Sequence, residues 1–317
     1  MTKNWLRRTA ALAVCASAAL LVACGSSTVD SAITPTRIVS FGDALSDLGQ
    51  TGTRYTINDG SVNIWTQQFA QNYGHTLTSV AAGGTSYAQG NARVTGTPDA
   101  AGVATTLTLT QQVDAFLATD KVTTGDMLVL NAGISDTITQ WAAVTAGTQT
   151  SADMVANARQ AGRDFGTQVR RLVTAGATHV VVTGTYDLSL SPWGIATNQT
   201  SLLSDASRAF NSALLVDVVS MGSNVLYVDA AYYFNLLVRS PGNYNLTNSA
   251  TPVCTSVDSG NGIGTGANQV NSALCTPSTL VAGADPLRYA FADAVYFTPA
   301  VNRLFGGYAY DQVRARW

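Results

Sequence analysis

The chain has 317 residues, of which 46% are hydrophobic and only 11% are charged, and its formal net charge is −2. That length holds one large domain or two small ones, and the apolar fraction is sufficient to bury a core. The near-neutral charge, without a basic stripe or aromatic residues interleaved with basic ones, argues against nucleic-acid binding.

Residues 1–23 have the pattern of a signal peptide. Lys3, Arg7 and Arg8 precede a short apolar run that ends in LVAC at Cys24. This run is too short and wrongly flanked for a stable membrane span. The LVAC ending resembles the lipobox of bacterial lipoproteins, which implies that Cys24 becomes the lipidated first residue of the mature protein. An ordinary secretory signal with a chance cysteine is the alternative.

The stretch 24–36 is predicted to be the lipidated cysteine and a flexible tether, because GSSTVDSAITP is rich in small and polar residues. Residues 37–317 are predicted to form one folded domain. Gly25, rather than an aspartate, follows the cysteine. We therefore expect an exported protein, lipid-anchored to the outer membrane or displayed at the cell surface of a Gram-negative bacterium.

Predicted strands and helices alternate along the rest of the chain. Short apolar runs predict strands at 37–41, 76–84, 126–133, 179–184 and 224–230. Apolar residues at helical spacing predict helices at 64–74, 109–120, 151–176, 202–222 and 298–313, with Ser151 as the N-cap of the third.

Alternating strands and helices predict parallel pairing through right-handed crossovers, and so a three-layer α/β/α sandwich with a parallel central sheet. In such sheets functional groups gather beyond the carboxyl ends of the strands. Polar residues or glycines stand at three predicted strand ends, at 42–47, 83–86 and 131–136.

Two cysteines remain in the predicted domain, Cys254 and Cys275. The stretch between them is rich in Gly, Ser and Asn and has little capacity to pack a core. An exported protein meets an oxidising compartment, so we expect a disulfide between them; two free thiols are the alternative. No His, Cys and Asp cluster has the spacing of metal ligands, and the sequence predicts neither a metal nor a cofactor.

Four stretches resemble, in order, the sequence blocks of the GDSL lipases and esterases, also called SGNH hydrolases. They are FGDALSDLG (41–49), VAAGGTSYAQGNARV (80–94), LVLNAGISD (128–136) and YAFADAVYFTPAVNRLFGGYA (289–309). The resemblance runs from about Arg37 to the C-terminus. It implies the flavodoxin-like SGNH-hydrolase fold and hydrolysis of carboxylic ester bonds in lipid or acyl-ester substrates.

The resemblance also implies a mechanism. In this family a serine after the first strand attacks the ester carbonyl, a histidine takes its proton, and an aspartate three residues earlier orients the histidine. The backbone N–H groups of the serine and of a second-block glycine, with a third-block asparagine, stabilise the oxyanion.

The sequence departs from that pattern where the chemistry takes place. Ala44 stands at the nucleophile position, Ser135 at the asparagine position and Tyr296 at the histidine position. Gly84 matches the oxyanion glycine, and Asp293 matches the triad aspartate. The pKa of a tyrosine is near 10, so Tyr296 is a poor substitute for imidazole as a base.

No other residue is a convincing replacement. His75 lies in a predicted turn and His179 at the amino end of a strand, away from the expected site. Ser46 is interpreted as a helix cap and Ser86 as a loop hydroxyl, while Asn131 supplies either an amide donor or a structural contact. The chain also has no Gly-x-Ser-x-Gly motif, which argues against an α/β-hydrolase.

These departures predict a GDSL-family ester hydrolase by descent that has lost its activity. Removing one triad member costs about 10⁴ to 10⁶ in rate, and here both nucleophile and base are absent. The alternative is a non-catalytic lipoprotein that binds an acyl or glycan group in the former cleft. A third hypothesis is an active enzyme with an unrecognised nucleophile. We expect a monomer with a small-molecule ligand, anchored to the membrane through Cys24.

Overall fold

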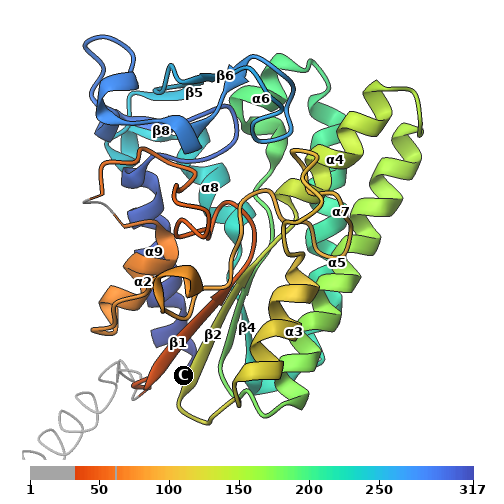
Figure 1. The fold of residues 1–317 in the computed structure, drawn as a ribbon, viewed down its shortest axis with the longest axis vertical. Helices are drawn as coiled ribbons and strands as arrows, with labels where there is room; N and C mark the ends of the chain where they lie inside the picture. Colours follow the sequence, from red (N-terminus) through yellow and green to blue (C-terminus); the bar gives the residue numbers. More distant parts are fainter. Residues whose placement is uncertain (1–32, 61–62) are drawn as a thin grey trace, which may run out of the picture.

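The computed structural model describes residues 33–60 and 63–317. Four parallel strands form a sheet in the order β1-β2-β3-β4, with helices on both faces (Figure 1). This confirms the predicted three-layer α/β/α sandwich. The predicted signal peptide, Cys24 and all of the tether before residue 33 lie outside the described residues.

The secondary-structure elements have the following bounds. The sheet consists of β1 (Arg37–Phe41), β2 (Asp126–Asn131), β3 (Val180–Thr183) and β4 (Val225–Tyr227). The helices are α2 (Trp65–Asn72), α3 (Leu109–Thr119), α4 (Ile134–Thr145), α5 (Ser151–Thr174), α6 (Pro192–Ala196), α7 (Thr200–Val219), α8 (Ala230–Arg239) and α9 (Pro299–Arg316). Short strands β5 (Asn248–Pro252) and β8 (Tyr289–Phe291) pair with each other, as do β6 (Val257–Asp258) and β7 (Gln269–Val270).

None of the helices in the described part of the chain is long and apolar enough to cross a membrane. The sequence did not predict α4 or α8. It placed the start of α5 correctly, but the cap is Thr150, whose hydroxyl accepts the N–H of Asp153, and not Ser151. Ser151 is instead the first residue inside the helix.

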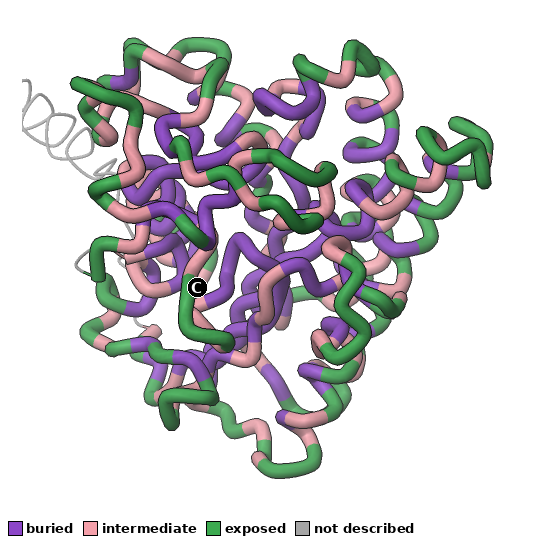
Figure 2. Tube along the Cα trace, turned by 45° about the horizontal axis from the view of Figure 1, so that its top comes forward, coloured by how far each residue is buried: buried purple, intermediate pink, exposed green. Residues whose placement is uncertain are grey.

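The strands of the sheet are apolar runs because both faces are covered. Every residue of β2 and β3 is buried, as expected for parallel strands between two helical layers. Figure 1 shows α2 and α9 on one side of the sheet and α3, α5 and α7 on the other, and Figure 2 shows the buried residues concentrated between these layers. At the amino ends, Arg37 clamps β1 to β2 by donating to both carboxylate oxygens of Asp126, at 2.9 and 2.7 Å.

The predicted strand at 76–84 is wrong. The chain there forms a 3₁₀ helix at Val80–Ala82, and the following residues run beside β1 instead. Ser40 N–H donates to Thr85 O, and Tyr87 N–H donates to Ser40 O. The chain thus leaves β1, passes through α2, returns along the free side of β1, and then crosses to β2. The connection reverses direction at β1, which makes the carboxyl edge between β1 and β2 the topological switch point where sites form.

A small cap covers the carboxyl end of the sheet (Figure 1). It contains β5 to β8 and the Cys254–Cys275 disulfide, which confirms the predicted pairing. The expectation that the enclosed stretch packs poorly is wrong at Ile263, which is 1% exposed and joins the main core. Gly264 lies so close to Ala100 O that a Cβ there would approach it to 2.2 Å. The disulfide-bounded segment is therefore packed down over the sheet edge.

Breaking the disulfide should destabilise this cap. It closes a loop with a sequence separation of 21 residues, so Cys254→Ala/Cys275→Ala should lower the free energy of unfolding by about 3 kcal/mol. Urea unfolding with and without a reductant measures the change. The double variant serves as the control, because reductant should leave its midpoint unchanged. Equal unfolding midpoints for the variant and the wild type would contradict the role given to the bond.

Candidate functional site

Two side chains, those of Gln112 and Asn131, pack closely around Gly42 in the turn after β1. The Gln112 side chain accepts the N–H of Gly42 and donates to its carbonyl, both at 2.9 Å. On the other side Asn131, at the end of β2, lies so close that a Cβ on residue 42 would be 2.0 Å from Asn131 Oδ1. Only glycine fits between these partners, so the sequence Gly-Asp at the strand end is required by packing.

Ala44 follows directly and its methyl group is buried, 2% exposed, within the main core. Asp43 shapes the turn around it, because Asp43 Oδ1 accepts the N–H of Leu45 at 3.0 Å and the side chain of Asn131 at 2.6 Å. The interpretation of Ser46 as a helix cap is wrong, because no helix begins there and the next one is α2 at Trp65. The Ser46 hydroxyl instead accepts the indole N–H of Trp65 at 3.0 Å. Neither Ala44 nor Ser46 reaches solvent.

Asp293 sits at the other side of the site, in the turn between β8 and α9. Its Oδ1 accepts the N–H groups of Val295 and Tyr296 at 2.8 and 2.7 Å. Its Oδ2 accepts the N–H of Ser272 at 3.0 Å and also its hydroxyl. Burial raises the pKa of Asp293, while these four donors act in the opposite direction. The carboxylate is thus occupied by the backbone and by Ser272, and no described contact joins it to the phenol of Tyr296.

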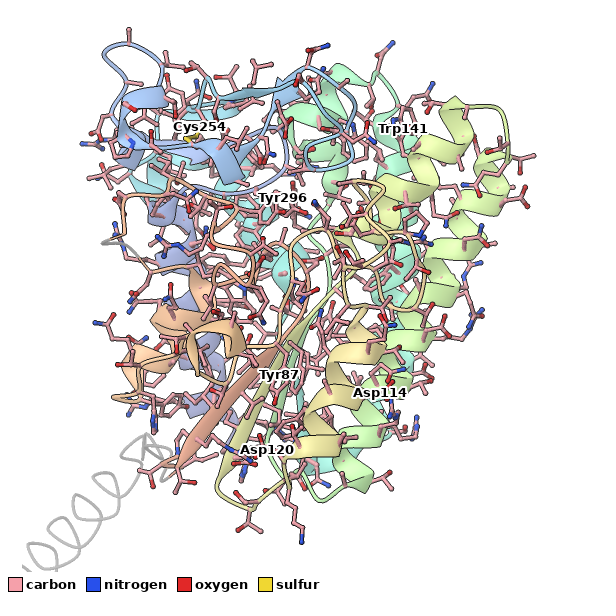
Figure 3. All side chains as sticks on the ribbon, viewed as in Figure 1. Tyr87, Asp114, Asp120, Trp141, Cys254 and Tyr296 are labelled. Atoms are coloured by element: carbon pink, nitrogen blue, oxygen red, sulfur yellow. A yellow bond between two sulfur atoms is a disulfide. The ribbon has the colours of Figure 1, made fainter. Side chains whose placement is uncertain are left out.

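Tyr296 lies between the cap and the carboxyl end of the sheet (Figure 3). Its ring packs edge-on against Tyr55 with centroids 5.5 Å apart, and it is fully buried. Burial first, and then the nearby carboxylates of Asp43 and Asp293, raise the pKa of Tyr296 well above its usual value. The phenol therefore stays neutral, and it cannot act as a base at physiological pH.

Ser135 lies in the first turn of α4 and faces the same phenol. Its proximity acts to lower the pKa of Tyr296, against the effect of burial, yet neither hydroxyl makes a hydrogen bond of good geometry within the described chain. Asp43 Oδ2, also buried, likewise has no partner there. The structure thus brings together Ala44, Ser135, Tyr296 and Asp293 around the turn of Asp43, and seals them from solvent.

Gly84 has a structural role that competes with the predicted one. Its N–H donates to Ser79 O at 2.9 Å, so the amide expected to stabilise an oxyanion is already occupied. A Cβ at this position would lie 2.1 Å from Thr78 Oγ1, which explains why the residue is glycine. The structure therefore does not support Gly84 as an oxyanion donor.

The residues considered as replacements lie elsewhere or are occupied. The His75 ring contacts Pro35 O at 2.7 Å, and the His179 ring packs edge-on against Trp317 at the amino end of β3. Asn131 has a structural role beside Gly42. Ser86 is buried beside β1 with its hydroxyl unpartnered among the described residues, and no basic side chain is recorded against it.

Sequence reasoning missed the residues that connect the blocks. Asp47 accepts the N–H of Gly90 at 2.7 Å and so ties the first block to the second. Asn91 adopts a positive φ of 60°, and its side chain donates to Tyr55 and to Gly262 O in the disulfide-bounded segment. The Gly-Asn pair was a visible turn signal, but its partners, more than thirty residues away in sequence, were not readable from it.

Three buried aspartates near the site have raised pKa values. Burial raises the pKa of Asp43, of Asp47 and of Asp136 to about 6 each. Asp136 accepts the N–H of Val94 and lies 3.8 Å from the Arg93 guanidinium, which lowers its pKa and so opposes the effect of burial. No three His, Cys, Asp or Glu side chains in the described ranges are grouped as a metal site requires.

A family model for GDSL-like lipases and acylhydrolases matches residues 38–308. This range includes the first three sequence blocks, the fourth block except its last residue, and the sheet except Arg37. No curated protein matches the sequence.

The buried aspartates should make the protein more stable at mildly acidic pH. Their pKa values rise from 3.8 to about 6 on folding, so the folded chain binds more protons than the unfolded chain between these values. The free energy of unfolding should therefore fall as pH rises from about 4 to about 7. Urea unfolding across this range measures the slope.

The variant Asp43→Asn tests one of these groups. It keeps an acceptor for Leu45 N–H and removes the ionisation, so the loss of stability between about pH 4 and 7 should shrink by on the order of 1–3 kcal/mol. Asp205→Asn, which alters an exposed acid on α7, is the matched control and should keep the wild-type slope. An unchanged slope in Asp43→Asn would show that Asp43 does not titrate in this range.

Proposed function

We propose that this chain, which belongs to the GDSL-like lipase/acylhydrolase family, keeps the fold of an ester hydrolase but does not hydrolyse esters by the family's serine mechanism. The observation that supports the proposal is that Ala44 and Tyr296 occur together in this chain. The residues that match the family's nucleophile and base are a buried methyl group and a buried phenol.

The chain lacks the nucleophile and the base that the family's reaction requires, and its remaining groups are occupied or changed. Ala44 has no lone pair with which to attack a carbonyl, and the neutral phenol of Tyr296 accepts no proton at physiological pH. Asp293 remains, but its four donors are backbone N–H groups and Ser272 rather than a catalytic ring. Of the oxyanion donors, Gly84 is occupied by Ser79 O, and Ser135 has a shorter reach than the asparagine it replaces.

In the wild type, burial of these side chains also restricts the access of a substrate to them. Ala44 is 2% exposed, and Ser135 and Tyr296 are fully buried. The Tyr296 ring lies beside Ser135 and Asp43, so an ester carbonyl would have to displace it to approach residue 44. Binding of an acyl or glycan group in this cleft, the alternative drawn from the sequence, requires the same opening and stays a prediction.

Hydrolysis of p-nitrophenyl esters tests the proposal. The wild type and Ala44→Ser should both show no turnover above background, because nucleophile and base act as one unit. Ala44→Ser/Tyr296→His should gain turnover at least about tenfold above background, since it restores the nucleophile and the base and replaces the phenol by a smaller imidazole. Ala44→Ser/Tyr296→Phe is the matched control, with a nucleophile but no base.

Two outcomes would contradict this account. Turnover by the purified wild type would show that the chain is an active enzyme. A well-folded Ala44→Ser/Tyr296→His variant without turnover would show that these positions are not the reactive pair.

The chain is also proposed to be a lipoprotein of the outer membrane or cell surface of a Gram-negative bacterium, anchored through Cys24. This rests on the sequence LVAC after a basic and apolar leader. Acylation with two or three chains anchors a protein stably, whereas a single chain binds only reversibly.

Metabolic labelling with an alkyne analogue of palmitate in a Gram-negative host tests the anchor. The full-length wild type should be labelled and Cys24→Ala should not. Cys15→Ala is the control, because this cysteine lies within the leader that is removed. Labelling of Cys24→Ala, or none of the wild type, would contradict the proposal.

A further inference from the structure

A groove of about 800 Å³ lies on the outside of α9, away from the closed site. Residues of α2, α8, α9 and the 3₁₀ helix at Pro241–Tyr244 line it, and these helices are neighbours on one side of the sheet in Figure 1. Neither Ala44 nor Ser135, Asp293 or Tyr296 takes part. Its volume is in the range of small-molecule sites.

Tyrosine rings form one wall of the groove. Tyr233 and Tyr308 stack with centroids 4.4 Å apart and an interplanar angle of 21°, and Tyr244 stands edge-on to Tyr233 at 5.8 Å. Tyr233 is 9% exposed and so anchors the group in the core. Packed tyrosines offer rigid apolar faces with hydroxyl groups at their edges.

Planar polar groups of mixed charge complete the lining. Arg303 and Asp311 come from α9, Gln68 from α2 and Asn245 from the turn after Tyr244. Within the described chain, the side chains of Arg303 and Asp311 have no recorded hydrogen bond or ion pair. Their donors and acceptors are thus available on the same surface as the tyrosine faces.

Gly307 leaves the floor of the groove open, although a glycine inside α9 lowers the stability of the helix. A glycine inside a helix costs about 1 kcal/mol relative to alanine. The preceding Gly306 is required by packing, because a Cβ there would lie 2.6 Å from Trp65 O. Gly307 has no such reason, since nothing lies within 4 Å of the place of its Cβ. It stands four residues from both Arg303 and Asp311, and any side chain there would project into the groove.

We propose that this groove binds a neutral oligosaccharide. A sugar presents hydroxyl groups that both donate and accept, and C–H faces that pack on aromatic rings, which matches carboxamide, guanidinium and carboxylate groups beside tyrosines. An anionic ligand would face Asp311, a cationic one would face Arg303, and an acyl chain would leave these charges unpaired. The proposal does not depend on the absence of ester hydrolysis.

Isothermal titration of the whole folded protein with maltotriose, cellotriose and triacetylchitotriose, all neutral, tests the proposal. At least one of these should bind with a Kd of about 1 mM or tighter. Gly307→Leu, which fills the floor, and Arg303→Ala should each weaken binding by at least about tenfold. Thermal melting should show Gly307→Leu to be at least as stable as the wild type, because leucine is the better helix former.

Two matched controls keep the test specific. Ala156→Leu adds the same side chain to an exposed position of α5 on the other side of the sheet, and Arg316→Ala removes an arginine from α9 beyond the groove. Both should bind like the wild type. No binding of any of the three saccharides at about 10 mM, equal weakening by the controls, or binding of phosphocholine in their place would overturn the proposal.

Discussion

The buried carboxylate of Asp293 is the interaction on which the closed site depends. Two of its donors come from the turn that carries Tyr296, and the other two come from Ser272 in the disulfide-bounded segment. A buried carboxylate is tolerated only when it is paired or well hydrogen-bonded. Loss of either set of donors would leave charge unsatisfied in the interior, so this one group holds both the cap and the Tyr296 turn in place.

Aromatic packing makes that turn rigid. Phe297 stacks on Phe234 with centroids 4.1 Å apart and on Phe291 at 5.0 Å, while Tyr186 donates to Val295 O at 2.7 Å. Interiors packed this densely resist displacement of a single ring. The Tyr296 ring is therefore held in place and leaves little room for a substrate. Within the described residues the hydroxyls of Ser135 and Tyr296 have no hydrogen-bond partner, and this is the remaining free-energy cost of the closure.

The sequence predicted the sheet and most of its helices because periodic apolar runs are set locally. It also pointed to Ala44, Ser135, Asp293 and Tyr296, which the structure places around one turn; their roles stay a prediction. It failed where contacts between separate segments determine the local structure. At 76–84 the strand-like pattern is wrong, because the residues after this stretch pair beside β1. At Gly84 the predicted oxyanion role is not supported, because its N–H donates to Ser79 O. The role of Ser272 was unreadable, because only folding brings it to Asp293.

The central claim is that the chain has the family's fold with a closed site that lacks a reactive nucleophile. Intact-mass analysis of the purified protein after incubation with an alkyl fluorophosphonate tests this most directly, because the probe labels activated serines whatever their position. The account predicts an unmodified mass under conditions that fully label an active serine hydrolase. A single stoichiometric adduct, mapped to any serine of the folded domain, would contradict it.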